Sequence, residues 1–321
     1  MTRRAGVLIN PFSGRNNGKG EALYQVLKDQ PGLSLHRFAD FAELEPAIDQ
    51  CAKDGVTDLF ISSGDGTIQA ILTHVAGKAN FKTLPQIGLL PHGTTNLTAG
   101  DIGLHIGSIA AQARFIKTLP DCKVATRHTI HVLNPVGAPP RLGFTLGAGA
   151  AARATRSAQV DYNDKGVKGS MASFATIAVG LAKAAFSKPK PGDLTRLDRA
   201  SPMTVTCDGK ITAQGNQLMF VATTLNHLFF RTQPFWGARN GALRTLTVAY
   251  PPPNILRWAL PLMYGRIGKN IPPGCVSFTS DAFEISCPEP YVMDGEFFDG
   301  PAQGALRVQA GPEFKFILGA A

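Results

Sequence analysis

The sequence predicts an α/β N-terminal domain followed by a C-terminal domain that is mainly an antiparallel β-sandwich. Three observations indicate this organisation. The first third alternates short apolar runs with helix-period segments, as parallel α/β sheets do. Beyond about Cys122 the pattern changes to consecutive strand-like runs. The chain has 321 residues and 44% hydrophobic content, enough for two cores.

Strands and helices alternate along the first domain. Strands are expected at Gly6–Ile9, Leu33–Phe38, Leu59–Ser62 and Gln86–Pro91. Helices are expected at Gly20–Asp29, Glu43–Asp54, from Thr67 onward, and at Ile106–Leu119. Gly55 stops the second helix and Pro120 ends the last. This order predicts three layers, with the loops that follow the strands at one sheet edge.

The second domain reads as a series of strands. They are expected at residues 123–133, 140–147, 203–214, 218–225, 242–250, 276–286 and 305–318. Asp208-Gly209 favours a type I′ hairpin turn. Two helices, Val167–Phe186 and Asn254–Tyr264, interrupt the strands. We therefore expect domains at residues 1–122 and 123–304.

Composition limits the class of protein. The net charge of +9 suits an anionic partner, but no RNP, zinc-finger or helix-turn-helix pattern is present, so nucleic acid is not expected. The five scattered cysteines contain no CxxC pair, which is typical of reduced, mostly buried thiols in a cytosolic protein. No stretch of roughly 20 residues is both uncharged and predominantly apolar, as a membrane span requires, so a soluble or peripheral protein is expected.

Three corners that follow predicted strands carry glycine together with hydroxyl or amide side chains. They are Asn10-Pro11-Phe12-Ser13-Gly14, Ser63-Gly64-Asp65-Gly66-Thr67 and Pro91-His92-Gly93-Thr94-Thr95-Asn96. The carboxyl edge of an α/β sheet is where ligands bind. Glycine turns let backbone N–H groups converge, and a helix N-terminus adds about half a positive charge. The corners therefore predict a phosphate site.

Asp65 is unexpected in such a site, because its carboxylate would repel phosphate. A bridging cation or a role toward the attacking group would resolve this, and both suit phosphoryl transfer around Mg²⁺. The alternative is that Asp65 only caps the helix that begins at Thr67. Because two similar corners share the edge, a nucleotide site is the favoured interpretation.

Taken in order, the motifs resemble the diacylglycerol kinase catalytic-domain family of lipid kinases, which includes bacterial diacylglycerol kinase-like enzymes, sphingosine kinases and ceramide kinases. The motifs are NPFSG, SGDGT with its helix, PHGTTN, and Asp294-Gly295-Glu296. The resemblance implies an ATP- and Mg²⁺-dependent lipid kinase with an N-terminal domain like that of NAD kinase and phosphofructokinase. It also implies a lipid-holding β-sandwich, and a C-terminal tail of about residues 305–321 that returns to the first domain.

The resemblance also implies roles for individual residues. The nucleotide-binding set is Asn10, Ser13, Gly14, Ser63, Gly64, Gly66, Thr67, His92, Gly93, Thr94 and Asn96. Glu296 matches the general base of bacterial members, whereas sphingosine kinases assign that task to the position of Asp65. Asp65 and Asp294 are the expected metal-linked carboxylates. Ser63 replaces the usual first glycine, and Asn240 replaces an aspartate that holds a structural metal in some members, so that second metal is left open.

The acceptor lipid is inferred from the charges of the segment that resembles the lipid-pocket corner. Arg153 and Arg156, with no acid before Asp161, favour a neutral lipid such as diacylglycerol or ceramide over a sphingoid base. The segment Leu256–Tyr264 either lines an acyl groove, enters the membrane interface, or packs on the sandwich. The cations that would suit anionic headgroups are Lys183, Lys188, Lys190, Arg196 and Arg199.

These features predict a cytoplasmic protein in peripheral contact with an anionic membrane. A homodimer is left open. Two other classes remain as alternatives: a sphingoid-base or soluble NAD kinase-like small-molecule kinase, and a non-catalytic lipid- or nucleotide-binding relative.

Overall fold

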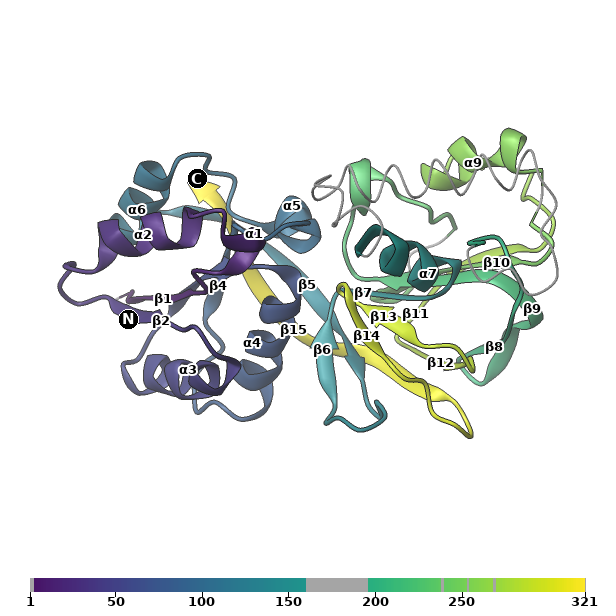
Figure 1. The fold of residues 1–321 in the computed structure, drawn as a ribbon, viewed down its shortest axis with the longest axis horizontal. Coiled ribbons are helices and arrows are strands. Elements are labelled where there is room, and N and C mark those ends of the chain that lie inside the picture. Colours follow the sequence, from purple (N-terminus) through teal and green to yellow (C-terminus); the bar gives the residue numbers. More distant parts are fainter. Residues whose placement is uncertain (1–2, 160–195, 238–239, 253, 268–269, 321) are drawn as a thin grey trace. The chain divides into compact units, whose positions relative to one another are not determined.

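The computed structural model describes residues 3–159, 196–237, 240–252, 254–267 and 270–320. It divides into two compact units, Met1–Thr129 with Pro312–Ala321, and Ile130–Gly311. The predicted helix Val167–Phe186 lies outside the described residues. Figure 1 shows the ribbon of each unit.

A parallel sheet forms the centre of the first unit, in the order β2-β1-β3-β4-β15. Its strands are β1 Ala5–Ile9, β2 Ser34–Arg37, β3 Asp58–Ser63, β4 Gln86–Pro91 and the end of β15 Leu306–Ala320. The end of β15 pairs with β4 through Phe316 and Ile87. The last strand of the chain thus extends the sheet begun by the first residues.

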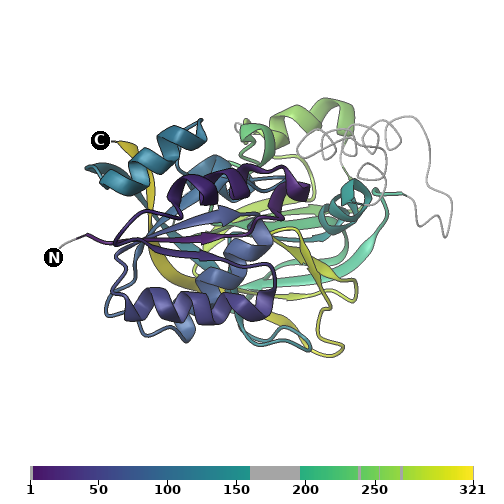
Figure 2. The ribbon, with the colours of Figure 1, turned by 60° about the vertical axis from the view of Figure 1, so that its left-hand side comes forward.

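Helices cover both faces of this sheet, with α2 and α6 on one side and α3 and α4 on the other (Figures 1 and 2). They are α1 Ser13–Asn16, α2 Lys19–Leu27, α3 Leu44–Lys53, α4 Asp65–Gly77, α5 Leu97–Ile102 and α6 Ile109–Thr118, with a 3-10 turn η1 at Phe41–Glu43. The predicted three-layer α/β arrangement is confirmed. The short helices α1 and α5 were not predicted, because four and six residues are too few to display a helical period.

The second unit is mainly antiparallel, as predicted. Its strands are the end of β5 Cys122–Val132, β6 Arg141–Gly143, β7 Thr145–Gly149, β8 Ser201–Cys207, β9 Lys210–Thr223, β10 Leu243–Ala249, β11 Cys275–Ser280, β12 Ala282–Ser286, β13 Tyr291–Met293, β14 Glu296–Phe298 and the start of β15. The long strand β9 pairs with β8 along its first part and with both β7 and β10 along its last part. One core results, in which Phe220 of β9 meets Phe283 of β12 at 5.2 Å between ring centroids.

Two predicted strands are each interrupted once. Phe144 separates β6 from β7, and Asp281 separates β11 from β12. Turn chemistry follows the sequence closely: Asp208 and Gly209 have φ values of 49° and 72°, the left-handed pair of a type I′ turn. Asp294 and Gly295 repeat this geometry with φ values of 48° and 89°.

The helical segments of the second unit are α7 Ala150–Ser157, the 3-10 turn η3 Phe229–Arg231 and α9 Ile255–Met263. Asn254 caps α9, since its side chain accepts from the N–H of Arg257. Among the described residues, no helix combines the length and apolar character that crossing a bilayer requires. All five cysteines are free, and four of them are buried.

The packing between β3 and β4 gives a first prediction. Gly88 of β4 lies opposite Phe60 of β3, and a Cβ at Gly88 would lie 2.4 Å from the ring of Phe60. Phe60 is fully buried and meets Phe115 edge-on, so the ring cannot move aside. We expect Gly88→Ala to lower the free energy of unfolding in urea by about 1–3 kcal/mol. Gly77→Ala, at an exposed position with open space around it, is the control and should change it by less than about 1 kcal/mol.

Candidate active site

The three glycine corners converge at the carboxyl ends of the neighbouring strands β1, β3 and β4. The hydroxyl of Ser13 and the Nδ2 of Asn17 both donate to the carbonyl of His92, at 3.1 and 3.0 Å. The other contact is between glycines, because a Cβ at Gly93 would lie 2.5 Å from the Cα of Gly64. The first and second corners are therefore each held against the third.

Asp65 joins the second and third corners through its carboxylate. Oδ2 accepts the N–H of Leu97 and Oδ1 accepts the N–H of Thr98, each at 3.1 Å. These are the first two residues of α5, whose N–H groups have no partner within their own helix. Burial raises the pKa of Asp65, and the two amide bonds oppose that shift. Asp65 therefore caps α5, although the sequence places it at the start of α4.

The N-terminus of α4 is left open by this arrangement. No side chain caps it, and its first N–H groups lie beyond the reach of intrahelical bonds. Gly64 precedes it with φ −91°, which any residue adopts, and a Cβ there would meet only the Cα of Gly93 at 3.7 Å. Neither backbone angle nor packing requires glycine at position 64. The fold itself therefore does not explain why residue 64 is glycine. A glycine beside an uncapped helix N-terminus lets an anionic ligand approach the backbone closely.

His92 supports the corner from within. Its ring is 1% exposed, with Nδ1 at 2.8 Å from the Ser62 hydroxyl and Nε2 at 3.1 Å from Oε1 of Gln112. Since Nε2 of Gln112 donates to the Ile106 carbonyl, its Oε1 accepts, and His92 carries its proton on Nε2. Burial lowers the pKa of His92 to about 4. Both ring nitrogens are engaged inside the protein, so the geometry favours support of the loop over contact with nucleotide.

The other predicted nucleotide residues divide into internal and outward-facing groups. Asn10 Oδ1 accepts the N–H of Phe12, and Nδ2 of Asn96 donates to the carbonyl of Gly93. Gly14 has φ +61° and packs against Asn17 and His92. Ser63 and Thr67 are buried, Gly66 is half-buried, and Thr94 is exposed. Within the part of the chain that the structure describes, the Ser63 hydroxyl and Oδ1 of Asn96 are buried without a hydrogen-bond partner.

Two residues that follow the first corner, Asn17 and Lys19, were not predicted to belong to the site. Asn17 ties the corner to His92, and its Oδ1 accepts the N–H of Lys19. The Lys19 ammonium is close enough to lower the pKa of His92 further, after burial. The side-chain amide and the lysine in the run Asn17-Gly18-Lys19 could have indicated from the sequence that these residues belong to the site. They were missed because the expected helix was placed to begin only at Gly20.

The predicted carboxylates of the second unit differ in what they contact. Asp294 is buried and accepts from the N–H groups of Phe144 and Thr145 and from the Thr145 hydroxyl, at 2.8–3.1 Å. Glu296 follows it across the hairpin turn and is exposed, and its carboxylate forms neither hydrogen bond nor ion pair with any described residue. Asp294 thus fixes the hairpin to β6 and β7, while Glu296 presents a free carboxylate.

The arginines assigned to lipid recognition are mostly occupied. Arg153 pairs with Glu289 at 2.7 Å and also donates to Ser201 and to the carbonyl of Leu197. The exposed Arg156 lies over the ring of Phe297, 4.8 Å from its centroid.

Two of the five predicted headgroup-binding cations are in the described part of the chain. Arg196 is buried and bound to Asp198 at 2.6 Å, so it does not offer its charge to a membrane surface. Arg199 is half-buried. Lys183, Lys188 and Lys190 lie outside the described residues. Asn240 is exposed, and its N–H donates to the Thr279 hydroxyl.

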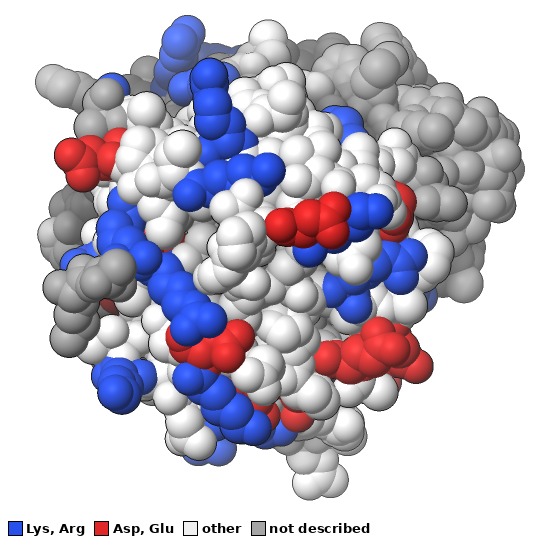
Figure 3. Space-filling model, turned by 90° about the vertical axis from the view of Figure 1, so that its left-hand side faces the viewer, with Lys and Arg blue, Asp and Glu red and all other residues white. Residues whose placement is uncertain are grey.

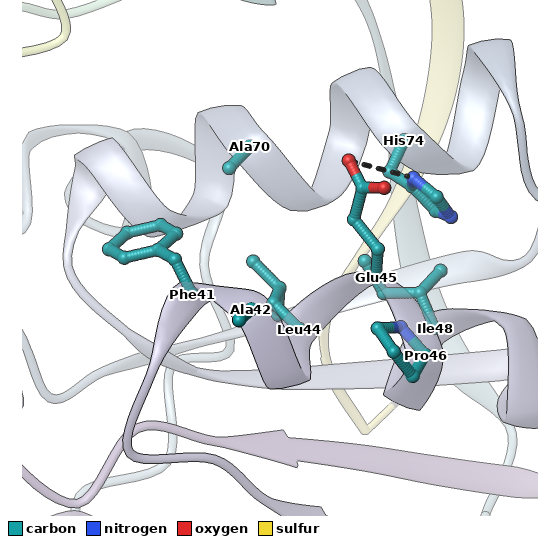
Figure 4. A pocket seen from close by; sticks show the side chains of 8 residues that line it. All are labelled: Phe41, Ala42, Leu44, Glu45, Pro46, Ile48, Ala70 and His74. Atoms are coloured by element: carbon teal, nitrogen blue, oxygen red, sulfur yellow. Dashed lines mark ion pairs between the residues drawn. The ribbon is translucent and has the colours of Figure 1, made fainter.

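A separate pocket of about 420 Å³ lies between α3 and α4 (Figure 4). Its lining residues are Phe41, Ala42, Leu44, Glu45, Pro46, Ile48, Ala70 and His74. Nε2 of His74 is hydrogen-bonded to Asp49 at 2.8 Å, and its Nδ1 lies 3.5 Å from Glu45, so His74 links the two helices. None of the lining residues belongs to the three corners, so this pocket is not the predicted nucleotide site.

The fold and the site together define a class of protein. Its members have an α/β unit with three converging glycine corners, followed in sequence by an antiparallel β unit. Residues 4–126 match the sequence model of the family "Diacylglycerol kinase catalytic domain". The resemblance drawn from the motifs is thereby confirmed for this part of the chain, and the match supports a kinase of the diacylglycerol kinase class. Comparison with curated proteins gave no match.

Solved structures of similar fold come from Bacillus anthracis. Two are described as a candidate diacylglycerol kinase, with TM-scores of 0.66 and 0.63 at 15% and 14% identity. A third, described as a diacylglycerol kinase, has a TM-score of 0.61 at 15% identity. Each covers 98% of this chain, and 95–97% of the solved chain is covered in return. At 14–15% identity, the structural similarity supports the assignment of the fold of both units and nothing more specific.

The buried His92 gives a prediction on acid stability. The folded protein keeps this ring neutral down to about pH 4, whereas an unfolded histidine takes up its proton near pH 6.5. The unfolded state therefore binds more protons between these values, and stability falls on acidification. We expect His92 to account for a loss of about 2 kcal/mol between pH 7 and pH 5.

Urea unfolding at both pH values checks this. The pH dependence of His92→Gln should be weaker by that amount, and His105→Gln, which changes an exposed histidine of the same unit, should keep the wild-type dependence. Equal pH dependence in all three proteins would contradict the buried neutral ring.

Proposed function

We propose that this protein is an ATP-dependent lipid kinase that transfers the γ-phosphate to a hydroxyl group of a neutral lipid such as diacylglycerol or ceramide. The family match supports the kinase assignment. The observation that carries the proposal is the uncapped N-terminus of α4 next to Gly64, whose lack of a side chain serves no internal purpose. In this proposal the triphosphate lies against these amides.

The surrounding residues are suited to such a ligand. Lys19 adds a positive charge beside the first corner, and Thr94 offers an exposed hydroxyl on the third. Gly93 lets the third corner approach the second without a side chain between them. Phosphoryl transfer depends mainly on positioning and charge neutralisation, which backbone amides and a lysine supply.

Glu296 is the better candidate for the general base. A base needs a carboxylate free to accept a proton, and Glu296 is exposed while both oxygens of Asp65 accept amide hydrogens. In the proposed step Glu296 takes the proton of the lipid hydroxyl, the lipid oxygen forms a bond to the γ-phosphorus, and ADP leaves with the electrons of the broken P–O bond. Asp65 then acts as a positioning residue for α5.

Asp65 and Asp294, the two carboxylates expected to bind Mg²⁺, both accept hydrogen bonds from backbone N–H groups. Each carboxylate oxygen has a second lone pair, so these bonds do not by themselves exclude a metal. A magnesium ion of a kinase is held by substrate phosphates, water and one or two carboxylates. Of the two, Asp65 adjoins the glycine corners and would be the one to hold it.

A neutral acceptor is favoured by the state of the acids near α7. The primary amine of a sphingoid base calls for a free carboxylate in addition to the base, whereas Glu289, which binds Arg153 of α7, is already paired. Diacylglycerol and ceramide carry no ionisable amine, so they need no such carboxylate. Mass spectrometry of a total lipid extract incubated with protein and ATP identifies which lipid gains phosphate, and NAD in a parallel incubation tests the soluble small-molecule alternative.

The glycine corners give one prediction. We expect Gly64→Ala to keep the wild-type stability within about 1 kcal/mol, because its Cβ has room, but to weaken ATP binding by about tenfold or more. Gly93→Ala should instead lower stability by about 1–3 kcal/mol, because its Cβ meets the Gly64 backbone. Calorimetric titration with ATP and urea unfolding separate the two effects. Unchanged ATP affinity in Gly64→Ala would remove the phosphate site from this edge.

The carboxylates of Glu296 and Asp65 give a second prediction for the site. Glu296→Gln should lower kcat by about 10²–10⁴-fold with stability and ATP affinity unchanged, as expected for loss of a base. Asp65→Asn should lower stability by about 1–3 kcal/mol, because its NH₂ would face an N–H group of α5. If Asp65→Asn lost kcat at wild-type stability while Glu296→Gln remained active, Asp65 would be the base.

A further inference from the structure

Helix α9 packs on one side and exposes apolar groups on the other. Leu262 contacts the core cluster of Leu246, Val248 and Cys275, which belong to β10 and β11. Leu260, two residues earlier, is 68% exposed, and Tyr264 at the end of the helix is 41% exposed. Figure 1 shows α9 over the strands of its own unit.

A loop adds a second exposed aromatic residue next to this helix. The N–H of Gln233 donates to the Met263 carbonyl at 2.9 Å, so the segment after η3 lies against the end of α9. Within η3, Phe230 is 42% exposed. Phe230 and Arg231 both have φ 55°, a left-handed conformation that non-glycine residues rarely adopt. The tip of this loop thus adopts a left-handed conformation in which the Phe230 side chain stays partly exposed.

The segment that carries these apolar groups is rich in cations, and its own sequence has no acid between residues 209 and 280. Arg231, Arg257 and Arg266 are exposed, and none forms an ion pair with any residue that the structure describes. Arg257 lies over Trp258 and Arg266 over Tyr264, at 5.1 and 5.9 Å from the ring centroids. In the sequence, residues 209–280 contain seven Lys or Arg and no Asp or Glu. We call Phe230, Arg231, Arg257, Leu260, Tyr264 and Arg266 the α9 face.

Other charged surface of this chain is different. Figure 3 shows a face of the molecule on which blue and red side chains are interleaved. In the first unit some exposed cations are paired, as Arg37 is with Glu21 at 3.0 Å and Lys78 with Glu45 at 3.3 Å. Others, such as Lys53 and Lys117, form no ion pair with any described residue. The α9 face combines unpaired cations with exposed leucine and aromatic groups.

We propose that the α9 face is a docking surface for an anionic lipid bilayer. Leucine and phenylalanine side chains enter the boundary between headgroups and acyl chains, tyrosine lies at headgroup level, and arginines bind lipid phosphates. A second copy of the chain is a poorer fit, because a symmetric dimer would set the same arginines against one another. The inference goes beyond the kinase reaction, since binding to a bilayer needs neither ATP nor turnover.

Co-sedimentation with vesicles tests the proposal. We expect the full chain to bind vesicles of equal parts phosphatidylcholine and phosphatidylglycerol about tenfold or more tightly than vesicles of phosphatidylcholine alone. The double variants Leu260→Ser/Tyr264→Ser and Arg257→Gln/Arg266→Gln should each weaken that binding by about tenfold. Circular dichroism and thermal unfolding establish that both variants are folded.

Matched substitutions elsewhere serve as controls. Ile211→Ser removes a 59% exposed apolar side chain from β9 of the same unit, and Lys53→Gln/Lys117→Gln removes two exposed cations from the first unit. Both should bind as the wild type does. Equal losses in variants and controls, or no preference for anionic vesicles, would overturn the proposal. A dimer in sedimentation velocity that becomes monomeric in the α9 variants would assign the face to self-association instead.

Phosphorylation of lipid in detergent micelles separates this proposal from the kinase assignment. The α9 variants should retain activity there, because the micelle delivers the substrate without a bilayer. Vesicle binding without phosphorylation would leave the docking surface standing and remove the kinase. Activity in micelles without vesicle binding would support the kinase assignment and overturn the docking surface.

Discussion

The bond between the Asp65 carboxylate and the first amides of α5 is the constraint on which the candidate site depends. A carboxylate placed at this depth needs partners, and the first N–H groups of a helix need acceptors. Each satisfies the other at 3.1 Å, through Leu97 and Thr98. As a result the loop after β4 is fixed against the loop after β3, and the N-terminus of α4 is left for an external anion.

The same physical requirement recurs across the protein. In the second unit, Asp294 binds the N–H groups of Phe144 and Thr145 and so fixes its hairpin to distant strands. In the first, the carbonyl of His92 accepts two side-chain donors from another corner, and its ring is held neutral by burial. Acids and amides beside these loops act mainly on the protein's own backbone. Among the carboxylates predicted for the site, Glu296 is the one that does not bind the protein's own backbone in this way.

Charge on this protein has to be considered residue by residue. The net charge of +9 suggests an anionic partner but does not place it. Arg153 and Arg196, which attract attention in the sequence, are neutralised by Glu289 and Asp198. The arginines around α9 have no such partner among the described residues, and they stand beside exposed Leu260. Burial and pairing decide which charges can act on a ligand or membrane.

The sequence by itself determined the α/β and antiparallel β classes, the strand-end corners and the left-handed turn at Asp208-Gly209, because periodicity and turn chemistry are local properties. It also carried the family resemblance, through motif order. It could not assign Asp65, His92 or Arg153, because their partners lie 20 to 136 positions away along the chain. Only the tertiary structure decided that Asp65 caps a different helix from its own, since that requires β3 and β4 to lie side by side.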